Sequence, residues 1–164
     1  MAGRGTCENR SVKKNITAAA VQFESVQADK AANLAKVRAF AEAAAGQGVG
    51  MAVFPECCLT GYWFLRNLTE AQLRALAEPA LDGPCARELL ALSRRHGMSI
   101  GAGLVEAGED GRLYNTYLFA MPNGEIQRHR KIHSFESKFI GSGSEYTVFD
   151  TPHAAAPAYS SATT

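Results

Sequence analysis

The chain has 164 residues, of which 46% are hydrophobic, so it has the size of one ordinary domain with a buried core. Its formal net charge is only +1, which argues against a nucleic-acid-binding surface or a funnel for acidic substrates, because both need a strong basic field. No stretch approaches the roughly 20 apolar residues of a membrane span, and residues 1–15 lack the apolar segment of a secretory signal, so we expect a frayed tail there.

The first part of the chain indicates a β–α–β order. Residues 16–23 form a short apolar run that predicts a buried strand, and residues 49–54 predict a second one. Between them, Asp29 is a candidate N-cap for a helix over residues 30–45, whose apolar side chains recur with a 3.6-residue period. This order predicts that the two strands are neighbours in one sheet and that the domain is of the α/β class.

The rest of the chain is predicted to add two helices and four strands. Thr69 caps a helix that runs to about residue 77, and Pro84 begins another that ends at His96, before Gly97. The expected strands cover residues 98–105, 113–121, 125–133 and 146–149, with a hairpin turn at 122–124. Residues 153–164 are small, uncharged and aperiodic, which predicts disorder.

The four cysteines indicate a reducing compartment. They form no CxxC pair, and the adjacent Cys57 and Cys58 are badly placed for a disulfide with each other. We therefore expect reduced thiols, a cytoplasmic protein and no zinc site. His129 and His133 lie four residues apart on a predicted strand, but no third metal ligand converges on them.

Three polar segments contain candidate catalytic residues. Glu56 directly follows a buried strand, where a rigid sheet often directs catalytic groups into a crevice. The basic run HRKIH at residues 129–133 lies on a predicted hairpin strand, and FESKF at residues 135–139 lies in the loop that follows. Taken singly, each segment is more typical of a solvated surface.

Taken together, these segments resemble the nitrilase superfamily of carbon–nitrogen hydrolases. The matching pieces cover residues 16–152 in the family's order: AAVQF, FPE with LTGY, the YN and PNGE hairpin, HRKIH and GSGSEYTVFDTP. The resemblance implies an α–β–β–α sandwich, incomplete here, and a Glu–Lys–Cys triad. It implies that Glu56 is the general base, Lys131 the cation beside the tetrahedral intermediate, and Glu136 the second acid seen in many members.

The reaction of this family explains why these residue types are needed. A thiol with a pKa of about 8.5 is mostly protonated at neutral pH. A carboxylate can take that proton and later return it to the leaving amine. A fixed ammonium then stabilises the charge that develops on the substrate. The reaction involves neither redox chemistry nor group carriage, so no organic cofactor is expected.

The resemblance ends where the family carries its nucleophile. There the family has an apolar strand with a Gly-x-x-Ile-Cys-Tyr-Asp type of motif, and none of this chain's cysteines (Cys7, Cys57, Cys58, Cys85) lies in such a motif. The codons allowed for residues 158–164, if read in the frame that starts one base earlier, can encode Gly-Val-Leu-Ile-Cys-Tyr-Asp. We hypothesise that the tail from about Ala154 is out of frame. We then expect exposed strand edges, marginal stability and no hydrolysis by this chain alone.

The predicted function is hydrolysis of a small amide, nitrile or N-carbamoyl substrate by the intact parent, which the resemblance implies is a homo-oligomer. The alternative is an inert remnant or a small-molecule binder that uses Glu56 and Lys131. A nucleic-acid binder through residues 128–131 is the weakest interpretation, because the net charge is balanced. Residues 62–64, YWF, predict either an aromatic pocket wall or simple packing.

Overall fold

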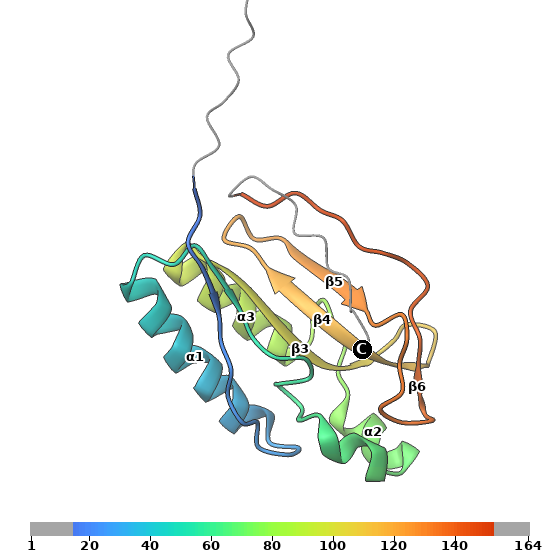
Figure 1. The fold of residues 1–164 in the computed structure, drawn as a ribbon. Coiled ribbons are helices and arrows are strands. Elements are labelled where there is room, and N and C mark those ends of the chain that lie inside the picture. Colours follow the sequence, from blue (N-terminus) through green and yellow to red (C-terminus); the bar gives the residue numbers. More distant parts are fainter. Residues whose placement is uncertain (1–14, 153–164) are drawn as a thin grey trace, which may run out of the picture.

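The computed structural model describes residues 15–152, which form a mixed six-stranded sheet with helices on one face (Figure 1). Of the predicted tails at residues 1–15 and 153–164, all but residue 15 lie outside the described residues, including the proposed out-of-frame segment. In chain order the elements are β1 (Ala18–Ala20), α1 (Lys30–Gly46), β2 (Met51–Val53), the 3-10 helix η1 (Trp63–Asn67), α2 (Glu70–Leu76), α3 (Pro84–His96), β3 (Ser99–Ala107), β4 (Leu113–Ala120), β5 (Ile126–Arg130) and β6 (Ile140–Gly141).

The sheet has a parallel half and an antiparallel half. The strand order is β1-β2-β3-β4-β5, and β6 pairs with β4 off this path. β1, β2 and β3 run parallel, so helices α1 and α3 connect them, whereas β3, β4 and β5 form an antiparallel meander. The predicted β1–β2 neighbourhood is therefore confirmed, and β2 is an interior strand rather than an edge.

Local signals place the helix ends where the sequence predicts them. The Asp29 side chain accepts a hydrogen bond from the Ala32 backbone N–H at the start of α1. Thr69 and Gln72 form a reciprocal capping box at α2. At the end of α3, Gly97 adopts a left-handed conformation with φ of 60°, which closes the helix without a steric penalty.

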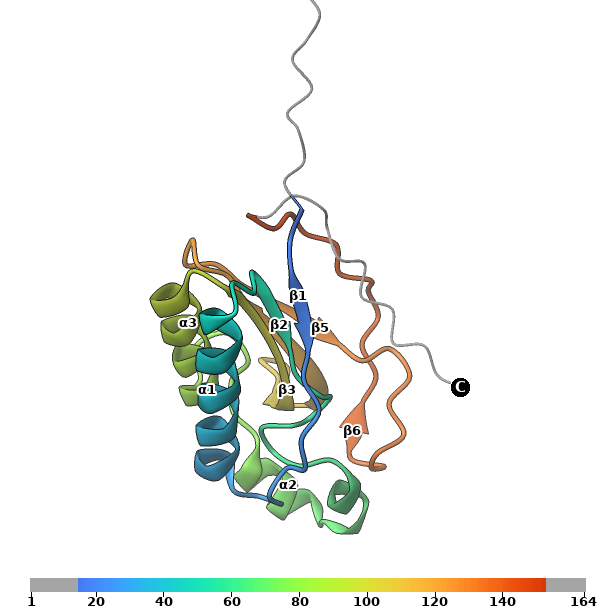
Figure 2. The same ribbon diagram turned by 60° about the vertical axis from the view of Figure 1, so that its left-hand side comes forward.

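The main core lies between the sheet and helices α1 and α3. Figure 2 shows both helices on one side of the sheet and the segment after β6 on the other. Both helices bury their inward stripe against the apolar residues of β3 and β4 that point to the same face. The buried members include Val37, Ala41, Leu89, Leu92, Ile100, Ala102, Leu104 and Leu118. None of the described helices is both long and apolar enough to cross a membrane.

The predicted strand at residues 146–149 is wrong. This segment has no ladder hydrogen bonds and instead lies across the open face of the sheet, where Phe149 packs 5.3 Å from Phe119 between ring centroids. The Thr147 hydroxyl donates to the Arg128 carbonyl, which fixes the segment without extending the sheet. Thr147 and Phe149 are partly buried whereas Tyr146 and Val148 are exposed, so the segment has one face inward, and the short strand in this region is β6.

Candidate active site

Glu56 lies on a tight loop that follows β2 and crosses β3. Cys57 adopts a positive φ of 48°, which non-glycine residues rarely do, and its carbonyl accepts hydrogen bonds from the backbone of Thr60 and Gly61. The loop approaches β3 closely because Gly103 has no side chain. A Cβ there would overlap the Cys57 backbone nitrogen and lie 3.1 Å from the carbonyl carbon of Glu56.

Asn33 of helix α1 holds this loop from the other side. Its buried amide donates hydrogen bonds to the Leu59 carbonyl at 3.0 Å and the Val26 carbonyl at 2.8 Å. Its carbonyl oxygen accepts from the Val26 N–H at 2.7 Å. A buried side chain with all these partners satisfied ties two loops to the helix.

Lys131 directly follows β5 and brings the three predicted site residues together. Its ammonium lies 2.9 Å from the Glu56 carboxylate and also contacts the Glu136 carboxylate. We call Glu56, Lys131 and Glu136 the acid–base cluster. The Lys131 and Glu136 side chains are only 10% and 2% exposed, whereas that of Glu56 is 44% exposed, so the cluster has a buried side and an open side.

Each charge in the buried part of the cluster is stabilised by its neighbours. Burial alone would raise the pKa of Glu136, but its hydrogen bonds, first among them that from Lys131, outweigh burial and lower it. Burial would likewise lower the pKa of Lys131, but hydrogen bonds to Glu136 and Glu56 raise it above its usual value. The lysine is therefore a permanent cation at neutral pH.

Asn115 belongs to this site, although the sequence reasoning did not single it out. Its amide lies between the two carboxylates and donates to Glu136 at 2.8 Å and to Glu56. Tyr62 also reaches the site, because its hydroxyl lies 3.4 Å from Glu136. The available signal was an amide side chain within β4, a strand whose residues are all buried. Buried polar side chains have hydrogen-bond partners, so an asparagine within a buried strand indicates other polar groups close by.

The described cysteines are all buried. Burial is the main reason that the pKa of Cys57 is raised well above its usual value, and burial likewise raises the pKa of Cys58 and of Cys85 to about 12. Thiols in this state are poor nucleophiles at neutral pH. Cys7 lies outside the described residues.

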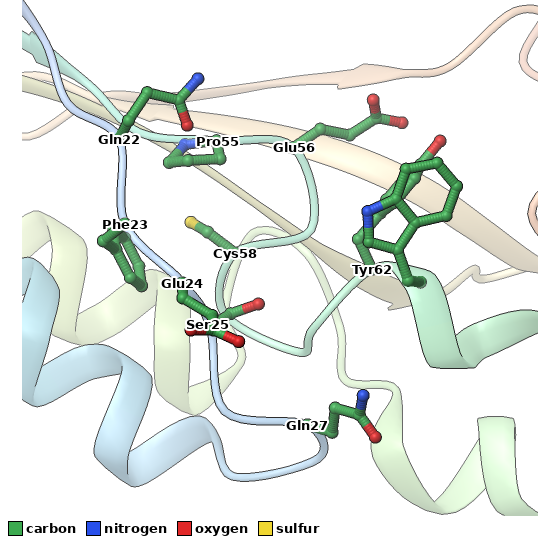
Figure 3. A pocket seen from close by; sticks show the side chains of 10 residues that line it. Gln22, Phe23, Glu24, Ser25, Gln27, Pro55, Glu56, Cys58 and Tyr62 are labelled. Carbon is green, nitrogen blue, oxygen red and sulfur yellow. The ribbon is translucent and has the colours of Figure 1, made fainter.

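A hollow of about 570 Å³ opens beside Glu56 (Figure 3). The hollow is bordered by the segment after β1 and by the loop after β2. Its lining residues are Gln22, Phe23, Glu24, Ser25, Gln27, Pro55, Glu56, Cys58, Tyr62 and Trp63. Of the aromatic run at 62–64, Tyr62 and Trp63 therefore line the hollow, whereas Phe64 packs against the core cluster near Leu65. The mixed lining suits a small molecule with both apolar and hydrogen-bonding parts.

The basic run on β5 is neutralised within the fold. Arg128 and Arg130 both form ion pairs with the fully buried Glu106 and with Glu109. This leaves little free positive charge for a phosphate backbone. Among residues 15–152, no group of three metal-ligating side chains is placed to hold an ion, and His129 contacts the Thr147 hydroxyl at 3.2 Å.

Comparison with known proteins gives a consistent result. The profile of the family described as carbon-nitrogen hydrolase matches residues 17–160. The chain is 29% identical over 138 residues to Omega-amidase NIT2 of Danio rerio, covering 76% of this chain and 47% of the relative. It is 30% identical over 150 residues to an aliphatic nitrilase of Rhodococcus rhodochrous, covering 83% and 40%.

Solved structures show the same likeness. Nit3 of Saccharomyces cerevisiae, a nitrilase-superfamily member, matches with a TM-score of 0.70 and 26% identity, covering 84% of this chain and 52% of that one. XC1258 of Xanthomonas campestris, a CN-hydrolase superfamily protein, matches with a TM-score of 0.68 and 25% identity, covering 81% and 48%. The chain spans about half the length of the relatives it matches.

Proposed function

This chain belongs to the carbon–nitrogen hydrolase family, and on that basis we propose that its acid–base cluster serves the hydrolysis of a non-peptide carbon–nitrogen bond. The proposed substrate is a small amide, nitrile or N-carbamoyl compound. The observation that carries the proposal is the contact of the Lys131 ammonium with both Glu56, at 2.9 Å, and Glu136. Relatives named as an amidase and as a nitrilase support the same reaction class.

The proposal assigns each member of the cluster a different task. Glu56 is the half-exposed carboxylate beside the hollow, so it takes the proton of the attacking thiol and returns it to the leaving amine. Lys131 stabilises the negative charge that develops on the substrate, with a contribution of about 3 kcal/mol. Glu136, which is buried, holds the lysine charged and in place.

The nucleophile in this proposal is a thiol outside residues 15–152. We assign this role to none of Cys57, Cys58 and Cys85, because they are buried and burial raises the pKa of each thiol. The activity proposed here is therefore that of a whole enzyme of which the described residues supply the acid–base part.

The proposal can be tested by combining this chain with the part of a related enzyme that it does not match. We would co-express it with the part of yeast Nit3 that this chain does not match, which is about half of that protein, and measure ammonia release from a panel of small amides. Glu56→Gln and Lys131→Met should each lower the rate at least ~100-fold. Lys138→Met, an exposed lysine in the same loop, is the matched control and should retain the full rate.

Two results would contradict this assignment. A Lys131→Met variant with the activity of the unsubstituted pair would remove the lysine from the mechanism. Ammonia release by the chain alone would show that the nucleophile is one of the chain's own four cysteines, so that no added half is needed.

The alternative function, a small-molecule binder, is favoured by the hollow beside Glu56. A thiol-reactive substrate analogue separates the two functions. An added mass on one cysteine of the co-expressed pair supports hydrolysis, because the reaction passes through a thioester. Saturable binding of the analogue without any covalent adduct supports the binder.

A further inference from the structure

Every member of the acid–base cluster is hydrogen-bonded to one residue, Asn115, which lies near the start of β4. The side-chain amide donates to Glu136, at 2.8 Å, and to Glu56. The backbone carbonyl accepts from the Lys131 N–H at 2.8 Å. On the remaining side, the amide oxygen of Asn115 accepts from the Cys57 thiol, with 3.1 Å between sulfur and oxygen.

The hydrogen-bonding capacity of its partners determines the orientation of the Asn115 side-chain amide. An ionised carboxylate only accepts hydrogen bonds, so the amide nitrogen has to face Glu56 and Glu136. The amide oxygen then needs a donor on its other side, and the Cys57 thiol is that donor. Burial, followed by the negative charges of Glu56 and Glu136, raises the pKa of Cys57 well above its usual value, so the thiol keeps its proton.

The loop places the Cys57 sulfur at this point through an unusual backbone conformation. Cys57 has a φ of 48°, and its side chain is completely buried beneath the loop that carries Glu56. A non-glycine residue in this region is strained, and such strain persists where the surroundings hold it. The same turn therefore aims two neighbouring side chains, Glu56 toward the ammonium and Cys57 toward the amide.

We propose that Asn115 and Cys57 form a positioning pair that holds Glu56 and Glu136 on the Lys131 ammonium. The inference rests on the proposed function and gives Cys57 a role that is neither nucleophile nor simple packing. Two carboxylates that share one site repel each other. An amide that donates to both of them offsets this repulsion and keeps both acceptor oxygens directed at the lysine.

The test measures the titration of Glu136 in this chain by carbon-detected NMR, so it needs no turnover. Asn115→Leu, which has nearly the same shape but no donor, should raise the pKa of Glu136, because a hydrogen bond to its charged form is lost. Cys57→Ala should shift it in the same direction, because the amide loses the donor that orients it. Cys57→Ser keeps a donor and should restore the original titration. The other titratable groups around Glu136 are the same in every variant, namely Lys131, Tyr62 and, on the other side of the lysine, Glu56.

Cys58→Ala is the matched control for the loss of a buried thiol. Cys58 is the next residue of the same loop, and its thiol is hydrogen-bonded to the backbone of Gly103 rather than to the Asn115 amide, so its removal should leave the titration of Glu136 unchanged. An unchanged titration in Cys57→Ala, or no restoration by Cys57→Ser, would overturn the proposal. If Asn115→Leu does not fold, the two Cys57 variants still decide. A co-expressed enzyme without hydrolytic activity would refute the proposed function but leave this result standing.

Discussion

Replacing Lys131 with methionine tests whether the acid–base cluster is held together by its charge. Methionine keeps much of the side-chain volume but leaves Glu136, which is 2% exposed, without its cation. Breaking a buried pair by removing one partner costs about 3–5 kcal/mol. We expect the free energy of unfolding to fall by about 3 kcal/mol, the lower end of this range. Glu56 is 44% exposed and can be rehydrated, so most of the loss comes from Glu136 alone.

The pH dependence of this loss separates charge from packing. The pKa of Glu136 is held below its unfolded value, so the carboxylate stabilises the fold above about pH 4.3. That stabilisation is lost as the pH falls through the lowered pKa. Urea unfolding at about pH 7 should therefore show the full difference between the wild-type chain and Lys131→Met, and unfolding at about pH 4 a smaller one.

The control for this experiment is Lys138→Met, which changes an exposed lysine in the same loop and should alter stability by less than about 0.5 kcal/mol. A Lys131→Met loss below about 1 kcal/mol at neutral pH would refute the reasoning. An equal loss of stability at both pH values would also refute it, because a loss caused by packing alone does not depend on pH.

Three further substitutions test the support of the site. Gly103→Ala should lower the free energy of unfolding in urea by about 1–3 kcal/mol, because its Cβ would overlap Cys57. Gly46→Ala is its control, because the added methyl group meets open space there and should not lower the free energy of unfolding. Glu106→Gln should cost about 3 kcal/mol in the same assay, since two partly exposed arginines lose a buried partner; a change under about 0.5 kcal/mol would refute this. Thr69→Ala removes the capping box, and thermal unfolding should show a loss of about 1 kcal/mol; an unchanged midpoint would contradict it.

The helices and the parallel strands could be predicted from sequence because their signals are local. Asp29, Thr69, Pro84 and Gly97 each act within one turn of a helix, so neighbouring residues decide where it begins or ends. The β–α–β order then restricts the possible sheet arrangements to a few. The convergence of Glu56 on Lys131 was expected from the family resemblance, and no local pattern contains it.

The remaining features depend on contacts between distant segments. Residues 146–149 are predicted to form a strand, but whether such a segment joins a ladder depends on a free strand edge, and here it lies across the sheet instead. β1 and β2 have only three residues each, fewer than the predicted strands at 16–23 and 49–54. The apolar runs on which those predictions were based continue beyond the paired residues into loops. Asn115 was missed because its role depends on loops 59 and 21 residues away in sequence.

The division of the sheet into two halves has a consequence for how the protein folds. Asn115, Lys131 and Glu136 belong to the meander and its following loop, where partners are close along the chain, whereas Glu56 contacts Lys131 across 75 residues. Pairing of β2 with β3 requires the long crossover through α3, and contacts of such high sequence separation form slowly. We therefore expect the contact between Lys131 and Glu136 to form early in refolding and the contact between Lys131 and Glu56 to form last.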